Sequence, residues 1–125
     1  MYSTVRYKTI QTETASRERL LVMLLDGALK NIRNGIAALE EGNGCASAML
    51  TKASDIVVEL HSTLDRSKAP ELCDQLGSLY RFVSLRLVIA ATSRDPNAAR
   101  EAERTLLPIA EAFKQAVARM AAANP

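Results

Sequence analysis

Few residues in this chain are of a type that could do chemistry, and they are widely spaced. His61 is the single histidine, and the two cysteines, Cys45 and Cys73, form no CxxC pair or other metal-type spacing. A metal site inside a helical bundle typically uses Glu-x-x-His spacing, whereas the residue three before His61 is Val58. We therefore expect His61 to be a partly exposed helical residue. The sequence predicts no metal site and no cofactor.

Other catalytic arrangements are also missing. The Gly42-Asn43-Gly44 stretch lacks the following Lys-Ser/Thr and the preceding strand of a phosphate-binding loop. Several aspartates are more simply interpreted as helix caps or solvated charges than as paired general acids: Asp26, Asp55, Asp65 and Asp74. Because no set of catalytic residues can be assembled, we predict that the protein is not an enzyme.

Composition narrows the class of protein further. The 125 residues are 48% hydrophobic and 24% charged, with a net charge of +2 and both signs interspersed, which gives no electrostatic footprint for nucleic acid or a membrane surface. The longest apolar run, Leu20 to Leu25, is far short of the roughly 20 residues that span a bilayer, and no signal peptide is visible. Cys45 and Cys73 would lie about 30 Å apart on successive antiparallel helices, and two free thiols suit a reducing cytosol. We expect a cytoplasmic protein.

Hydrophobic periodicity predicts an all-α fold, an antiparallel up-down four-helix bundle. An N-terminal arm over residues 1–15 precedes a bundle over 16–122, with helices at about 16–41, 46–65, 71–93 and 96–122. Ser16 is a good N-cap, Gly42 and Gly44 supply a turn, and Pro70 starts the third helix. Asp95 followed by Pro96 starts the fourth helix.

Two kinds of residue interrupt these helices. Pro108 falls inside the fourth segment and predicts a kink there or a break at Leu107. Gly27 and Gly35 are unfavourable inside the first helix, so we interpret both as points where a second helix approaches closely.

The chain has more apolar surface than a four-helix bundle needs. Each helix requires one apolar stripe, but the third helix is apolar nearly all round, with Tyr80, Phe82, Leu85, Val88 and Ile89 outside its main stripe. Either this helix is central and buried on several sides, or a groove beside it accepts an amphipathic segment of another protein. Homodimerisation through the same surface stays open. The arm adds sparse apolar residues that could lie in such a groove: Tyr2, Val5, Tyr7 and Ile10.

Several stretches, in order, resemble the flagellar secretion chaperone FliS family. Thr14-Ala15-Ser16 followed by MLLDGALKNIRNGIAALEEGN (23–43) is similar to the family pattern TASP, then MLYDGAL. KASDIVVEL with STLD (52–65) resembles the family's second helix, and LGSLYRFVSLRL (76–87) resembles its third. The opening Met-Tyr, with a second Tyr a few residues on, also fits the family.

The chain departs from the family pattern at four points. Arg17 stands in place of a usual Pro, Leu25 in place of a usual Tyr, and Gly77 follows Leu76 in the third helix. The family's frequent Trp late in the last helix is absent, and Phe113 is the nearest substitute. These changes affect residues that could anchor a partner, and they leave the apolar stripes that form the core intact. They therefore bear on which partner is bound.

The resemblance implies a cytoplasmic export chaperone whose partner is the disordered C-terminal segment of flagellin. It implies that the arm covers part of the binding surface until flagellin displaces it, and it leaves open contacts with the export gate and other flagellar regulators. The rival interpretation is a non-enzymatic helical module that dimerises or binds a different amphipathic helix. The predicted displaceable cover is Tyr2, Val5, Tyr7 and Ile10, and the predicted flagellin groove is Ile56, Leu60, Leu64, Leu79, Tyr80, Val83 and Leu87.

Overall fold

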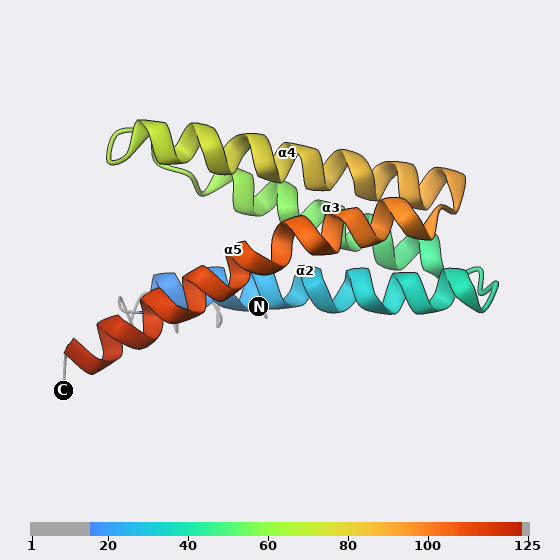
Figure 1. Cartoon of the computed structure of the whole chain (residues 1–125), viewed down its shortest axis with the longest axis horizontal. Coiled ribbons are helices and arrows are strands. Elements are labelled where there is room, and N and C mark those ends of the chain that lie inside the picture. Colours follow the sequence, from blue (N-terminus) through green and yellow to red (C-terminus); the bar gives the residue numbers. More distant parts are fainter. Residues whose placement is uncertain (1–15, 124–125) are drawn as a thin grey trace, which may run out of the picture.

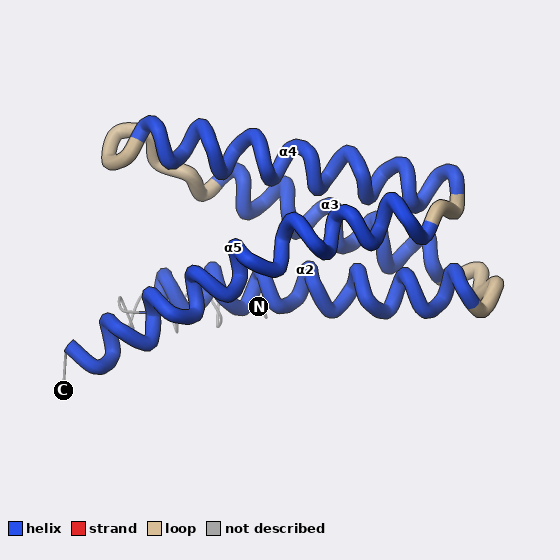
Figure 2. The backbone as a smooth tube through the Cα atoms, viewed as in Figure 1, coloured by secondary structure: helices blue, strands red, loops and turns tan. Residues whose placement is uncertain are grey.

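The described part of the chain consists of four long helices joined by short loops (Figures 1 and 2). The computed structural model describes residues 16–123, and the predicted arm lies outside them. The helices are α2 (Ser16–Glu40), α3 (Ala46–Ser62), α4 (Pro70–Ser93) and α5 (Pro96–Ala123). The predicted all-α bundle is confirmed.

The helices alternate in direction along the bundle. Each helix packs against the next one in the sequence, and α5 closes the ring by packing against α2 as well as α4. Figure 1 shows the loop between α2 and α3 at the same end as the turn between α4 and α5, with the loop between α3 and α4 at the other end. This is the up-down arrangement that short connections favour.

Two of the residues predicted to begin or end helices, Gly42 and Asp95, act as expected. Gly42 has a φ of +72°, the left-handed conformation that glycine adopts without strain, and the amide of Asn43 donates to the carbonyl of Ala38 at 2.8 Å. The carboxylate of Asp95 accepts a 2.9 Å hydrogen bond from the amide of Asn97, which caps the start of α5. These caps explain why the first and last loops lie close to where the sequence predicts them.

One prediction about a helix end needs correction. The second helix ends at Ser62 rather than near residue 65, and the hydroxyl of Thr63 donates back to the carbonyl of Leu60 at 2.6 Å. The loop that follows turns at Asp65, whose carboxylate accepts a 3.0 Å bond from the amide of Ser67. Of the two alternatives predicted at Pro108, the break at Leu107 does not occur, because α5 continues through Pro108. Figure 1 shows the second half of this helix slanting away from α4.

One of the two glycines in α2 marks a close helix contact. A Cβ built on Gly35 would lie 2.6 Å from Cδ2 of Leu50, closer than any real contact, so α2 and α3 approach through the missing side chain. A Cβ on Gly27 would meet only Cδ1 of Ile56, at an ordinary 3.8 Å. The prediction of a close approach is therefore confirmed at Gly35 and wrong at Gly27.

Ion pairs fasten α5 to both of its neighbours. Arg33 of α2 meets Glu103 at 2.6 Å, and Asp26 of α2 meets Lys114 at 2.8 Å. On the other flank, Arg86 of α4 pairs with Glu101. These partly exposed contacts add little stability individually, but they fix the register of α5. No helix within residues 16–123 is long and apolar enough to span a bilayer.

Candidate partner-binding site

The structure divides the predicted flagellin groove between the core and the surface. Leu60, Tyr80, Val83 and Leu87 are buried in the shared core of the bundle. Ile56 and Leu64 are partly buried at its edge, whereas Leu79 is exposed on α4. The four buried residues present almost no surface to a partner. The binding role of the seven predicted groove residues stays a prediction.

Tyr80 and Leu79 illustrate this division, because they are neighbours in sequence on α4 and only Leu79 is exposed. Tyr80 is 2% exposed, and burial raises the pKa of its hydroxyl to about 12. Tyr80 is therefore a core residue in this structure, and its predicted role in binding a partner stays a prediction.

An apolar groove lies between the first half of α4 and the second half of α5. It encloses about 350 Å³, and every residue that lines it is apolar. Leu72 is 54% exposed at its rim although it is a large aliphatic side chain. We call this feature the α4–α5 groove, lined by Leu72, Leu76, Pro108, Ile109, Ala112, Phe113 and Ala116.

Pro108 gives a physical reason for the position of this groove. Its ring removes one backbone donor and crowds the carbonyl one turn earlier, so the helix axis changes direction there. The second half of α5 slants away from α4 in Figure 1, and the groove lies where the two helices separate. The apolar stripe of α4 continues into this opening, which leaves Leu72 and Leu76 without full cover.

A second apolar surface runs along the side of α4 that faces away from the bundle. Leu85 is 57% exposed, and its neighbours at helical spacing are also exposed. We call this surface the outer face of α4: Phe82, Leu85, Val88 and Ile89. The third helix is therefore not central, because it packs mainly against α3 and α5 and carries an exposed apolar surface opposite its buried stripe.

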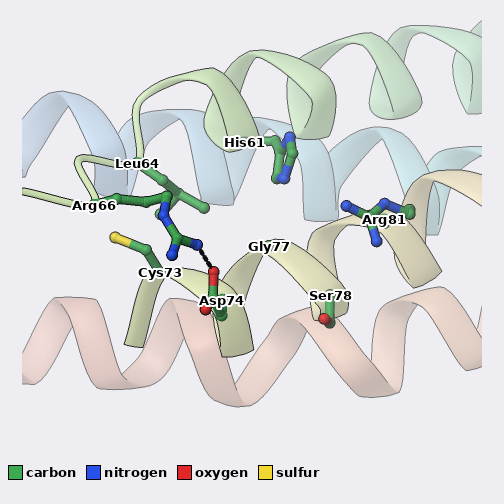
Figure 3. A pocket seen from close by; sticks show the side chains of 8 residues that line it. All are labelled: His61, Leu64, Arg66, Cys73, Asp74, Gly77, Ser78 and Arg81. Atoms are coloured by element: carbon green, nitrogen blue, oxygen red, sulfur yellow. Dashed lines mark hydrogen bonds and ion pairs between the residues drawn. The ribbon is translucent and has the colours of Figure 1, made fainter. Parts of the chain in front are cut away.

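A polar pocket of about 460 Å³ lies between the end of α3 and the first half of α4 (Figure 3). Gly77 forms its floor, and His61 points toward that floor from α3. Arg66 reaches in from the loop and pairs with Asp74. We call it the polar pocket, lined by His61, Leu64, Arg66, Cys73, Asp74, Gly77, Ser78 and Arg81.

The thiols and carboxylates of the described chain form no metal centre. Cys45 is exposed at the start of α3 and Cys73 is buried at the start of α4, and both are free. Residues 16–123 contain no group of three His, Cys, Asp or Glu side chains that could hold a metal ion. The hydroxyl and amide of Ser67 hydrogen-bond to Asp65 and hold its pKa below the usual value.

Comparison with known proteins identifies the family. Residues 1–120 match the family described as flagellar protein FliS. The chain belongs to the FliS family. Flagellar secretion chaperone FliS of Salmonella typhimurium is 36% identical over 104 residues, which cover 82% of this chain and 77% of that protein. Flagellar secretion chaperone FliS of Bacillus subtilis is 33% identical, over 89% of this chain and 83% of that protein.

A relative in Pseudomonas aeruginosa carries a slightly different name. Flagellar secretion chaperone FliSB is 31% identical over 100 residues, which cover 79% of each chain. The family resemblance read from the ordered sequence stretches is therefore confirmed. FliS chaperones are not a class of enzymes, which agrees with the absence of a predicted catalytic set.

Three of the departures from the FliS pattern have structural consequences. Leu25 is fully buried in the core. Phe113, the substitute for the missing Trp, lines the α4–α5 groove. Gly77 leaves room for the imidazole of His61, since a Cβ there would lie 3.0 Å from Nε2.

The sequence alone missed most of the α4–α5 groove. Leu72 and Leu76 share a helical stripe with Val83 and Leu87, so periodicity gives no reason to separate exposed members from buried ones. The usable signal was Pro108, because a proline inside α5 indicates where that helix turns away from its neighbour.

Proposed function

We propose that this FliS-family chain is a cytoplasmic chaperone that binds the C-terminal segment of flagellin, keeps it from polymerising and delivers it to the flagellar type III export apparatus. The observation that carries the proposal is the α4–α5 groove, an apolar trough on the surface of a FliS-family bundle. The names of the relatives, flagellar secretion chaperones, support the same role.

The groove suits an amphipathic helix that forms on binding. An amphipathic segment inserts anchors at helical spacing into an apolar channel between two helices. Ordering a disordered segment costs about 2–5 kcal/mol of gross binding energy, so contacts must extend along a large surface. The outer face of α4 lies on the same helix as one wall of the groove and offers further apolar area.

We propose that the N-terminal arm covers this surface in the empty chaperone. Tyr2, Val5, Tyr7 and Ile10 supply sparse apolar side chains for that purpose. Covering an apolar channel would keep the unloaded protein from associating with other exposed apolar surfaces. Flagellin would then have to displace the arm.

The groove is tested with Leu72→Ser, a change of a half-exposed rim residue. The purified chain is titrated with a peptide of the C-terminal segment of flagellin from the same organism, by calorimetry. We expect a one-to-one complex and at least about a tenfold loss of affinity in Leu72→Ser, because an apolar anchor is removed. The matched control is Met23→Ser, since Met23 is 63% exposed on α2 and does not line the groove. Equal affinities of the two variants, or no binding at tens of micromolar, contradict the proposal.

The arm is tested by deleting residues 1–14 and, separately, by replacing Tyr2, Val5, Tyr7 and Ile10 with Ser in the full chain. We expect both variants to keep the cooperative unfolding of the bundle and to bind flagellin more tightly, because a competitor is removed. If the deletion abolishes cooperative unfolding, the arm belongs to the core.

The outer face of α4 favours a second candidate function, a helical module that dimerises or binds another amphipathic helix. Its exposed Phe82 and Leu85 are the kind of residues found in protein interfaces. Sedimentation equilibrium separates the two functions. A dimer that Leu85→Ser dissociates, in a chain that does not bind flagellin, favours the second.

A further inference from the structure

We propose that the polar pocket binds a carboxylate side chain of the partner segment, and so contributes to the choice of partner. The inference deepens the proposed function, on which it rests for the identity of that partner. The ligand chemistry itself, a protein carboxylate, follows from the charges and shape of the pocket.

The shape of the pocket depends on Gly77. With no side chain on this residue, the helix backbone of α4 forms a floor beneath the imidazole of His61 (Figure 3). A Cβ would lie 3.0 Å from Nε2 of His61 and 3.7 Å from Cδ1 of Leu64. A side chain at this position would therefore displace His61, whose imidazole lines the pocket.

The charges around the pocket favour an anion. Asp74 is the only carboxylate among the lining residues, and Arg66 already pairs with it. Arg81 takes part in none of the ion pairs formed among residues 16–123. Arg81 lines the same pocket one turn after Gly77, and Figure 3 shows its guanidinium beside that turn, to the right of Gly77 and His61.

The donors in the pocket match the geometry of a carboxylate. A guanidinium presents paired N–H groups that fit the two carboxylate oxygens, and Arg81 supplies one that is not engaged by another ion pair in the described chain. The imidazole of His61 and the hydroxyl of Ser78 add polar groups on the same concave surface.

The pocket lies next to the surface proposed for flagellin. Gly77 of the pocket follows Leu76 of the α4–α5 groove directly in sequence, and a shallow depression lined by Gln75 and Leu79 shares Asp74 and Ser78 with the pocket. A segment that leaves the groove and crosses the first half of α4 would therefore bring a side chain to Arg81. Apolar anchors in the groove would supply affinity, and an acidic residue in the pocket would fix the register.

The first experiment uses a small probe on the full chain. Backbone amide spectra are recorded by NMR during titration with acetyl-glutamate amide, with neutral acetyl-glutamine amide and with inorganic phosphate. We expect saturable shifts at Gly77, Ser78 and Arg81 with the glutamate probe only. Arg81→Gln and Gly77→Ala should abolish them, the first by removing charge and the second by displacing the imidazole of His61. Arg104→Gln is the control, because Arg104 is an exposed arginine of α5 outside the pocket.

The outcomes of this titration decide whether the pocket binds a carboxylate. No saturable shift with the glutamate probe, a response to phosphate alone, or an equal loss in Arg104→Gln each overturns the proposal. Retained binding in Gly77→Ala also overturns it, since general surface charge would then explain the shifts.

The second experiment measures the binding of flagellin. Arg81→Gln should weaken its binding by about three- to tenfold and make the affinity less dependent on salt, with Arg104→Gln unchanged. Equal affinities of wild type and Arg81→Gln overturn the inference while the proposed function stands. If the wild-type chain binds no flagellin, the proposed function fails, and the glutamate titration still decides whether the pocket takes carboxylates.

Discussion

Each of two helix interfaces contains a residue that is unfavourable inside a helix, Gly35 between α2 and α3 and Pro108 between α4 and α5. The first interface is tightly closed, and the second is open. Between α2 and α3, Gly35 lets the helices approach until a Cβ would lie 2.6 Å from Leu50, and Leu50 is fully buried. Between α4 and α5, the helices separate after Pro108 and leave a groove of about 350 Å³. The first interface is closed by packing, whereas the second leaves apolar surface exposed.

The largest expected effect lies in the closed interface. Leu50→Ala removes a fully buried side chain and should lower the free energy of unfolding by about 2–5 kcal/mol, because it forfeits apolar burial and leaves a cavity. Chemical denaturation measures it. A loss below about 1 kcal/mol would mean that the α2–α3 interface can collapse around the cavity and is not closely packed.

The two glycines of α2 provide a matched pair. Gly35→Ala should destabilise the protein by about 1–3 kcal/mol, because its Cβ would overlap Leu50, which is enclosed and cannot move away. Gly27→Ala should instead stabilise by up to about 1 kcal/mol, since its Cβ meets Ile56 at an ordinary distance and alanine favours the helix. Denaturation midpoints compare the two variants directly. The same sign for both changes would contradict the assignment of the close approach to Gly35.

Phe113→Ala tests the open interface. We expect a loss of only about 1 kcal/mol in the free energy of unfolding, because part of this side chain is already exposed in the groove. Denaturation of Phe113→Ala beside Leu50→Ala gives the contrast. If the two changes cost the same, the groove is as much a part of the core as the α2–α3 interface.

The smallest effect concerns Tyr80 and is absent at neutral pH. Because the folded pKa of Tyr80 is raised from 10.0 to about 12, the unfolded chain loses its proton first. Its contribution to stability is fully present below pH 10 and is lost as the pH rises through about 12. Denaturation between these limits should show a steeper loss of stability in wild type than in Tyr80→Phe. Identical pH profiles would mean that Tyr80 is not enclosed.

Much of the fold could be predicted from local sequence signals. Gly42 in the first turn and Asp95 before Pro96 mark ends that the structure reproduces, because caps satisfy backbone groups within a few residues. The end of α3 lies earlier than apolar periodicity predicts. The hydroxyl of Thr63 donates a hydrogen bond to the carbonyl of Leu60, and apolar periodicity carries no information about such a local bond.

The candidate site could be predicted only in part. The excess of apolar residues on the third helix is visible in the sequence and is real, as the exposed Phe82 and Leu85 demonstrate. The stripe that contains Leu72, Leu76, Val83 and Leu87 gave no sign of which members a neighbouring helix covers.

The sequence by itself determined the four helices of residues 16–123, most of their ends and the membership of the FliS family, because caps, turns and apolar periods act over short distances along the chain. Only the tertiary structure decided that Tyr80 is core and Leu72 is groove rim. Exposure depends on where a second helix lies, and the course of α5 after Pro108 is fixed by packing between residues far apart in the chain.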